Sequence, residues 1–205
     1  MSAIAEPHPR GRRRRADAER SIAAILDSAV RVLRERPQAS IEDIAEAAGV
    51  TRQTIYAHFD SREVLINAVI DRVTEEVVAA IDAADLEKGP PAAALLRLLD
   101  ASWQTFERYP FLSHLPPLSP QQSYDRHEAI FERLERLIRR GQETGDFNRQ
   151  LSPTWLLAAT IGLAHAAGEE VGAGRMTADD AINALRSSVL RVFGIDALPQ
   201  RRVCV

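Results

Sequence analysis

Apolar residues recur at helical spacing along almost the whole of this 205-residue chain. In the first such segment they fall on one face of an amphipathic helix: Ile22, Ile25, Leu26, Ala29, Val30 and Leu33. No segment shows the strict alternation of apolar and polar residues that is typical of a half-buried strand. The sequence therefore predicts an all-α fold of about nine helices.

Composition excludes several classes of protein. The single cysteine, Cys204, allows neither an intramolecular disulfide nor a zinc site built from several thiolates. No stretch approaches the roughly 20 apolar residues that span a bilayer, and no apolar segment follows the basic N-terminus as in a signal peptide. We expect a cytoplasmic protein.

Charge is distributed unevenly along the chain. Residues 1–15 contain five arginines and one glutamate, whereas the whole chain has a net charge of −3. This segment also contains Pro7, Pro9 and Gly11, so we expect a disordered basic arm that ends at Arg15. Such an arm suits an anionic partner, either nucleic acid or a membrane surface, and the alternative is a merely solubilising tail.

Residues 40–59 are predicted to form two short helices joined by a tight turn. Ser40 and Thr51 are typical N-cap residues, Asp43 occupies the acidic position of a capping box, and Gly49 can end the first helix in the left-handed conformation. Ile55 and Phe59 would return to the core. This pattern is a helix-turn-helix, whose second helix would expose Arg52, Gln53, Thr54 and His58 together.

Residues 41–70, IEDIAEAAGVTRQTIYAHFDSREVLINAVI, resemble the tetracycline-repressor (TetR) family of transcriptional regulators. The shared features are Ile44-Ala45, Ala48-Gly49-Val50, the Tyr56-x-x-Phe59 ending, and a capped helix that opens with Ser61-Arg62-Glu63 and Leu65. The chain departs from the family pattern at Arg62, where lysine is usual, and at Gln53, where a smaller residue is common.

The resemblance implies roles in DNA binding for individual residues. Arg52 and Gln53 would read bases, because arginine can bond guanine and glutamine can bond adenine bidentately. Helix N-termini favour phosphate, but capping alone also explains Ser40 and Thr51, and core packing explains the Tyr56 ring. Arg15 would belong to an arm along the DNA backbone or in the minor groove. The predicted DNA-binding residues are Arg15, Ser40, Thr51, Arg52, Gln53, Thr54, Tyr56, His58 and Arg62.

The resemblance also implies a division of the chain. The arm at 1–15 would precede a DNA-binding domain at 16–62, and an effector-binding and dimerisation domain would occupy 63–198. Residues 199–205 would form a loose tail. The helix at 61–84 would connect the two domains and act as a lever between them.

Eight of the eleven aromatic residues lie between Trp103 and Trp155. Core packing explains most of them, but the same residue types would line a pocket for a small apolar or aromatic molecule. His165 and Glu169 stand four residues apart, as a polar handle or, less favoured, a metal pair. The predicted ligand-binding residues are Trp103, Phe106, Tyr109, His114, Phe131 and His165.

The helices at about 153–172 and 177–194 are rich in apolar and small residues. With a symmetry mate they would form a four-helix dimer interface, and the alternative is that they pack inside one large monomer core. A two-fold dimer would present two recognition helices to a palindromic operator.

Together these features predict a ligand-responsive repressor that a small apolar or aromatic molecule releases from its operator. The sequence contains no nucleophile elbow, phosphate-binding glycine loop or metal motif, so we expect neither an enzyme nor a cofactor. The alternative is a helical ligand-binding or interaction protein without operator binding.

Overall fold

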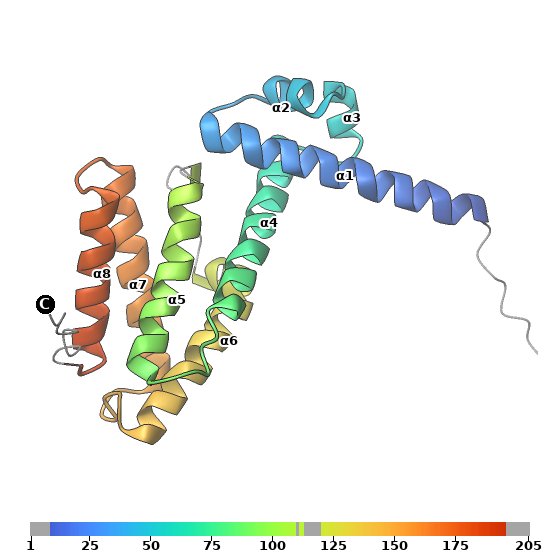
Figure 1. Cartoon of the computed structure of the whole chain (residues 1–205). Helices are drawn as coiled ribbons and strands as arrows, with labels where there is room; N and C mark the ends of the chain where they lie inside the picture. Colours follow the sequence, from blue (N-terminus) through green and yellow to red (C-terminus); the bar gives the residue numbers. More distant parts are fainter. Residues whose placement is uncertain (1–8, 110, 113–119, 196–205) are drawn as a thin grey trace, which may run out of the picture. The chain divides into compact units, whose positions relative to one another are not determined.

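The structure, a computed structural model, describes residues 9–109, 111–112 and 120–195 (Figure 1). Every regular element in these ranges is helical, which confirms the all-α prediction. The described residues form eight α-helices, close to the expected nine, and residues 111–112 add one tight helical turn. The helices are α1 (Pro9–Glu35), α2 (Ile41–Ala48), α3 (Arg52–Tyr56), α4 (Arg62–Ala83), α5 (Pro91–Arg108), α6 (Pro120–Thr144), α7 (Pro153–Gly172) and α8 (Ala178–Val192).

The first helix starts earlier than the sequence predicted. The disordered arm is predicted to end at Arg15, but α1 begins at Pro9, so residues 9–15 of this arm are helical. Proline suits the first position of a helix, and arginine has a high helix propensity, so these residues can continue the helix toward its N-terminus. Residues 1–8 and the predicted tail at 199–205 lie outside the described residues.

The chain divides into two compact units, residues 1–72 and 73–205, which we call the head and the body. This division lies ten residues beyond the expected boundary at 62. The reason is that the first part of α4 contributes to the head core, where Leu65 and Val69 are fully buried. The helix α4 therefore begins in the head and ends in the body.

The head packs its helices around a small aliphatic core. Ile25 and Ala29 of α1, Ile44 of α2 and Ile55 of α3 are all fully buried. The spacing of these residues follows the helical repeat, so each short helix has one buried and one exposed face. Burial of this face, rather than intrinsic propensity, stabilises helices as short as α2 and α3.

The body is built from α5 to α8 and the last part of α4. Its core is mainly aliphatic and includes the fully buried Leu95, Ile138 and Leu156. The rings of Phe147 and Phe193 meet edge to face, 4.9 Å apart, where the turn after α6 reaches the end of α8. A Cβ atom on Gly141 would lie 2.1 Å from the Phe147 ring, so this close approach requires glycine.

Candidate nucleic-acid interface

The turn between α2 and α3 is fixed by the capping residues that the sequence predicted. The Ser40 hydroxyl accepts from the Asp43 backbone N–H at 3.1 Å, and an Asp43 carboxylate oxygen accepts from the Ser40 N–H at 2.8 Å. Gly49 ends α2 with φ +67°, and the Thr51 hydroxyl accepts from the Thr54 N–H at 3.1 Å. These bonds satisfy backbone groups that would otherwise be unpaired at the helix ends.

Asp43 is held in its ionised form. The Ser40 hydroxyl, which donates to it at 2.6 Å, and the Ser40 backbone N–H lower the pKa of Asp43 below its ordinary value. The Arg36 guanidinium adds an ion pair at 2.9 Å and acts in the same direction. The capping box therefore depends on a charged carboxylate at neutral pH.

Helix α3 presents a polar face, as the sequence predicted. Arg52, Gln53 and Tyr56 are exposed, whereas Ile55 between them is fully buried. Tyr56 is 37% exposed, so part of its side chain is buried and part remains at the surface. Thr54 and His58 are half-buried at the border of this face.

Four other predicted DNA-binding residues have structural partners or lack a described side chain. Ser40 and Thr51 cap helices, and the Thr54 hydroxyl shares a hydrogen bond of 2.9 Å with that of Thr51. Arg62 donates to the Ala39 carbonyl oxygen at 3.2 Å, which ties the start of α4 to the loop before α2. The backbone of Arg15 lies in α1, and its side chain lies outside the described residues.

One neighbour of the α3 face was not predicted from the sequence. Glu42 of α2 forms an ion pair with Arg52, although ten residues separate them. The Arg52 guanidinium also lies 5.3 Å from the centre of the Tyr56 ring, and its Nη2 donates to the Tyr56 hydroxyl at 3.5 Å. Tyr56 and then Glu42 raise the pKa of Arg52. No helical spacing connects Glu42 to Arg52, so only the geometry of the turn reveals the pair.

The structure gathers part of the predicted effector-binding set in the body core. Trp103 is buried and its ring centre lies 5.2 Å from that of Phe106, while buried Phe131 belongs to the same cluster. The Trp103 indole N–H donates to Glu107 at 3.1 Å. Tyr109 is also buried, and its hydroxyl donates to Glu76 of α4 at 2.7 Å.

Of the two histidines in the predicted set, the structure describes only His165, which does not join these aromatic residues. His165 is exposed on α7, half a turn around the helix from the buried Leu156 and Thr160. His114 lies outside the described residues. No group of three or more histidine, cysteine, aspartate or glutamate side chains in the described ranges could hold a metal ion, so His165 and Glu169 have no third ligand there.

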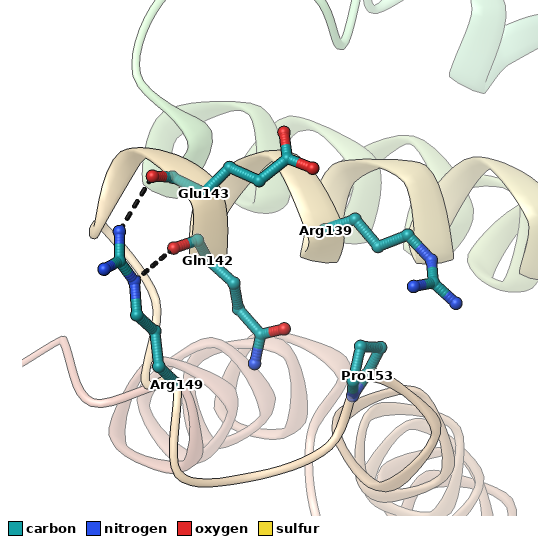
Figure 2. Close-up of a pocket in the computed structure, with 5 residues that line it drawn as sticks. All are labelled: Arg139, Gln142, Glu143, Arg149 and Pro153. Atoms are coloured by element: carbon teal, nitrogen blue, oxygen red, sulfur yellow. Dashed lines mark hydrogen bonds between the residues drawn. The ribbon is translucent and has the colours of Figure 1, made fainter.

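A surface hollow of about 470 Å³ lies at the end of α6. None of the predicted effector-binding residues is among the residues that line it. Four of its five lining residues are polar or charged, and Figure 2 shows Arg149 turned toward the last turn of α6. Arg149 donates to the carbonyl oxygens of Gln142 and Glu143, the latter at 2.8 Å. These bonds satisfy helix-end carbonyls, so Arg149 serves as a helix cap.

Comparison with known proteins assigns the chain to a family. The family described as "Bacterial regulatory proteins, tetR family" matches residues 25–69, which contain α2, α3 and the start of α4. The solved structure of the TetR-like regulator LfrR from Mycobacterium smegmatis, in complex with proflavine, is 30% identical with a TM-score of 0.59. That match covers 88% of this chain and 99% of LfrR. The chain belongs to the TetR family of transcriptional regulators.

Proteins related to this chain in sequence are also named as helix-turn-helix transcriptional regulators. The LfrR repressor of Mycolicibacterium smegmatis is 42% identical over 83 residues, but this alignment covers only 40% of this chain and 44% of LfrR. The regulator NfxB of Pseudomonas aeruginosa is 28% identical over 76% of this TetR-family chain and 85% of NfxB. The strongest sequence similarity is thus concentrated in less than half of the chain.

One face of α7 is exposed although the helix is rich in apolar and small residues. Trp155 is 58% exposed, and Ala158, Gly162 and Ala166 are exposed on the same side. A Cβ atom on Gly162 would meet no atom within 4 Å. No helix in the described part of this TetR-family protein is long and apolar enough to cross a membrane.

Proposed function

We propose that this protein is a dimeric repressor that binds a palindromic operator and leaves it when a small apolar or aromatic effector binds. The observation that carries this proposal is the polar face of α3. Arg52 and Gln53 are exposed there on a helix whose start, turn and buried side are all fixed. Arginine suits guanine and glutamine suits adenine in the major groove. Such a protein acts in the cytoplasm, where its operator is.

The exposed face of α7 supports the dimer. Apolar side chains and small residues on a solvent-exposed helix allow a second helix to approach closely. Together with α8, this face would form a four-helix interface with a second copy of the chain. A two-fold dimer would space its recognition helices by about 34 Å, one turn of DNA, or a multiple of it.

The aromatic cluster of the body supports the class of effector. Trp103, Phe106 and Phe131 offer flat apolar surfaces of the kind that bind aromatic ligands. The relative LfrR has been crystallised with proflavine, which is a small aromatic molecule. Proflavine is therefore the first compound to test on this chain.

The helix α4 supports the coupling of effector and operator. Its last turns are bonded to the other helices of the body: Glu76 accepts from Tyr109 at 2.7 Å, and Asp82 accepts from Arg133 at 2.6 and 2.8 Å. Its first turns are buried in the head through Leu65. A shift of body helices would therefore pass along α4 to α3. A coupling of about 1–3 kcal/mol, or 5- to 150-fold in affinity, is typical of such devices.

Genomic selection tests the DNA-binding part of the proposal. Sheared DNA from the source organism is bound to the purified full chain, recovered and sequenced, beside an Arg52→Ala/Tyr56→Phe variant. We expect the native protein to enrich a palindromic site that the variant does not enrich. Failure of the native protein to enrich any site would favour a helical ligand-binding protein without operator binding.

A titration with proflavine tests the effector class on the selected site. We expect proflavine to weaken operator binding by about 5- to 150-fold and to quench the tryptophan fluorescence of the body. A titration with a water-soluble aliphatic compound of similar size separates a preference for aromatic effectors from general apolar binding. Unchanged operator affinity together with unchanged fluorescence would exclude proflavine.

A further inference from the structure

The ion pair between Glu42 and Arg52 is unusual for a surface that would face a polyanion. Both side chains are more than half exposed, and both belong to the first turns of their helices, α2 and α3. DNA phosphates repel a carboxylate, so Glu42 opposes the attraction that Arg52 would exert. The pair does not support the fold either, because exposed ion pairs contribute little to stability.

The surroundings of Arg52 constrain its guanidinium from two sides. Its Nη1 donates to Glu42, and its plane lies near the Tyr56 ring, with Nη2 directed to the Tyr56 hydroxyl at 3.5 Å. Its Nε has no hydrogen-bond partner among the described residues. Arg52 is thus a directed donor with part of its charge neutralised, rather than a freely moving cation.

This arrangement affects random and specific DNA differently. A lone phosphate would have to compete with Glu42 for Arg52, and the exchange of one anion for another gains little. A guanine edge offers two acceptors in the plane of the guanidinium, and this bidentate contact is far more selective than attraction to phosphate. Glu42 therefore lowers the affinity for random DNA more than the affinity for the specific site.

We propose that Glu42 is a specificity-determining residue, which restrains Arg52 from binding phosphate indiscriminately and orients it for base recognition. This inference rests on the proposed operator binding. Glu42 would act through Arg52 without contacting DNA itself. A dimer would contain two such pairs, so their effects on discrimination would combine.

Fluorescence anisotropy with two labelled duplexes tests this role. One duplex carries the site selected by the native protein, and the other is a random sequence of equal length. Glu42→Gln removes the carboxylate charge but leaves the capping box of Ser40 and Asp43 in place. Glu46→Gln is the matched control, because it removes the same charge from an exposed position of the same helix, where no ion pair is formed among the described residues.

We expect Glu42→Gln to tighten binding to the random duplex and to lower the ratio of specific to random affinity about 3- to 10-fold. Glu46→Gln should leave this ratio unchanged. In an Arg52→Ala background, Glu42→Gln should also leave the ratio unchanged, since no guanidinium remains to restrain. Circular dichroism and a melting curve confirm that each variant is folded.

Two other outcomes separate the inference from the proposed function. If the native protein prefers its site but Glu42→Gln and Glu46→Gln change both affinities alike, then Glu42 acts only through net charge and the inference is wrong. If the native protein shows no preference for any sequence, the proposed operator binding itself fails, and the role of Glu42 fails with it.

Discussion

The α3 face and the aromatic cluster around Trp103 differ in where their predicted ligand-binding residues lie. On α3, Arg52 and Gln53 are exposed while the apolar Ile55 is buried beneath them. In the body, Trp103, Tyr109 and Phe131 are themselves buried and already have protein neighbours. Recognition by a convex polar surface needs only exposed side chains, whereas recognition by a pocket needs empty space between buried ones.

A binding site on an exposed helix face is therefore easier to predict from sequence than a binding pocket in the core. On an amphipathic helix the polar residues lie on the exposed face, so the sequence pattern itself indicates which side chains are available to bind a partner. Aromatic residues that line a pocket have the same composition as aromatic residues that fill a core.

Ala158→Arg should have the largest effect on operator binding, because it would place a charge in the proposed dimer interface. We expect a monomer, and operator affinity lower by about 100-fold or more, since the two half-sites could no longer be bound together. Sedimentation equilibrium and anisotropy measure the two effects. Ala129→Arg, on an exposed position of α6, is the control and should remain dimeric. An Ala158→Arg protein that stays dimeric would remove α7 from the interface.

Trp103→Ala tests whether the cluster is core or pocket. Truncation of a tightly packed tryptophan should destabilise the body by about 3–5 kcal/mol, measured by urea unfolding. The exposed neighbour Gln104, changed to alanine, should have almost no effect. A loss below about 1 kcal/mol for Trp103→Ala would show that its ring borders open space, as a ligand-lining residue does.

Tyr109→Phe tests the polar bond between α5 and α4. We expect a loss of about 1–2 kcal/mol in stability, because the Glu76 carboxylate loses a hydrogen bond in a partly buried place. Burial, followed by Glu76, raises the pKa of Tyr109 above 10.0. The stabilisation is therefore complete below pH 10.0 and is lost as the pH rises through the higher folded value.

Unfolding curves at rising pH measure this second effect. The native protein should lose stability above pH 10.0 more steeply than Tyr109→Phe does. The half-exposed Tyr124, changed to phenylalanine, serves as a control and should match the native stability at neutral pH. An equal alkaline loss in native protein and Tyr109→Phe would mean that other groups cause it.

Asp43→Asn should have the smallest effect and concerns the head. The pKa of Asp43 lies below its ordinary value of 3.8, so its stabilising charge is present above pH 3.8 and is lost as the pH falls through the lower folded value. We expect a melting temperature a few degrees lower at neutral pH and a shallower loss of stability in acid. Glu46→Gln, outside the capping box, should preserve the native acid profile.

Local signals in the sequence predicted much of the head. Ser40, Asp43, Gly49 and Thr51 have the predicted capping roles, because capping depends on residues within one helical turn. The pairing of Glu42 with Arg52 could not be predicted in this way. It depends on how the turn brings the starts of two helices together, which no spacing rule encodes.

Prediction was less complete in the rest of the chain. The helix α1 begins earlier than the sequence predicts, because Pro9 suits a helix start and arginine has a high helix propensity, although prolines and a run of like charges are also typical of disorder. The bond between Glu76 and Tyr109 joins residues 33 apart and follows from packing alone. The roles of the predicted DNA-binding and effector-binding residues remain predictions, because they depend on contacts with DNA and with a small molecule.

A base-substitution scan of the selected operator tests the central claim that α3 reads DNA. Each base pair of the site is replaced in turn, symmetrically in both half-sites, and the affinities of the native protein and of Arg52→Ala are measured. We predict that the native protein loses about 1–3 kcal/mol at one guanine position per half-site, where Arg52→Ala is indifferent to the base. Parallel profiles for the two proteins, with the same loss at every position, would contradict base recognition by Arg52.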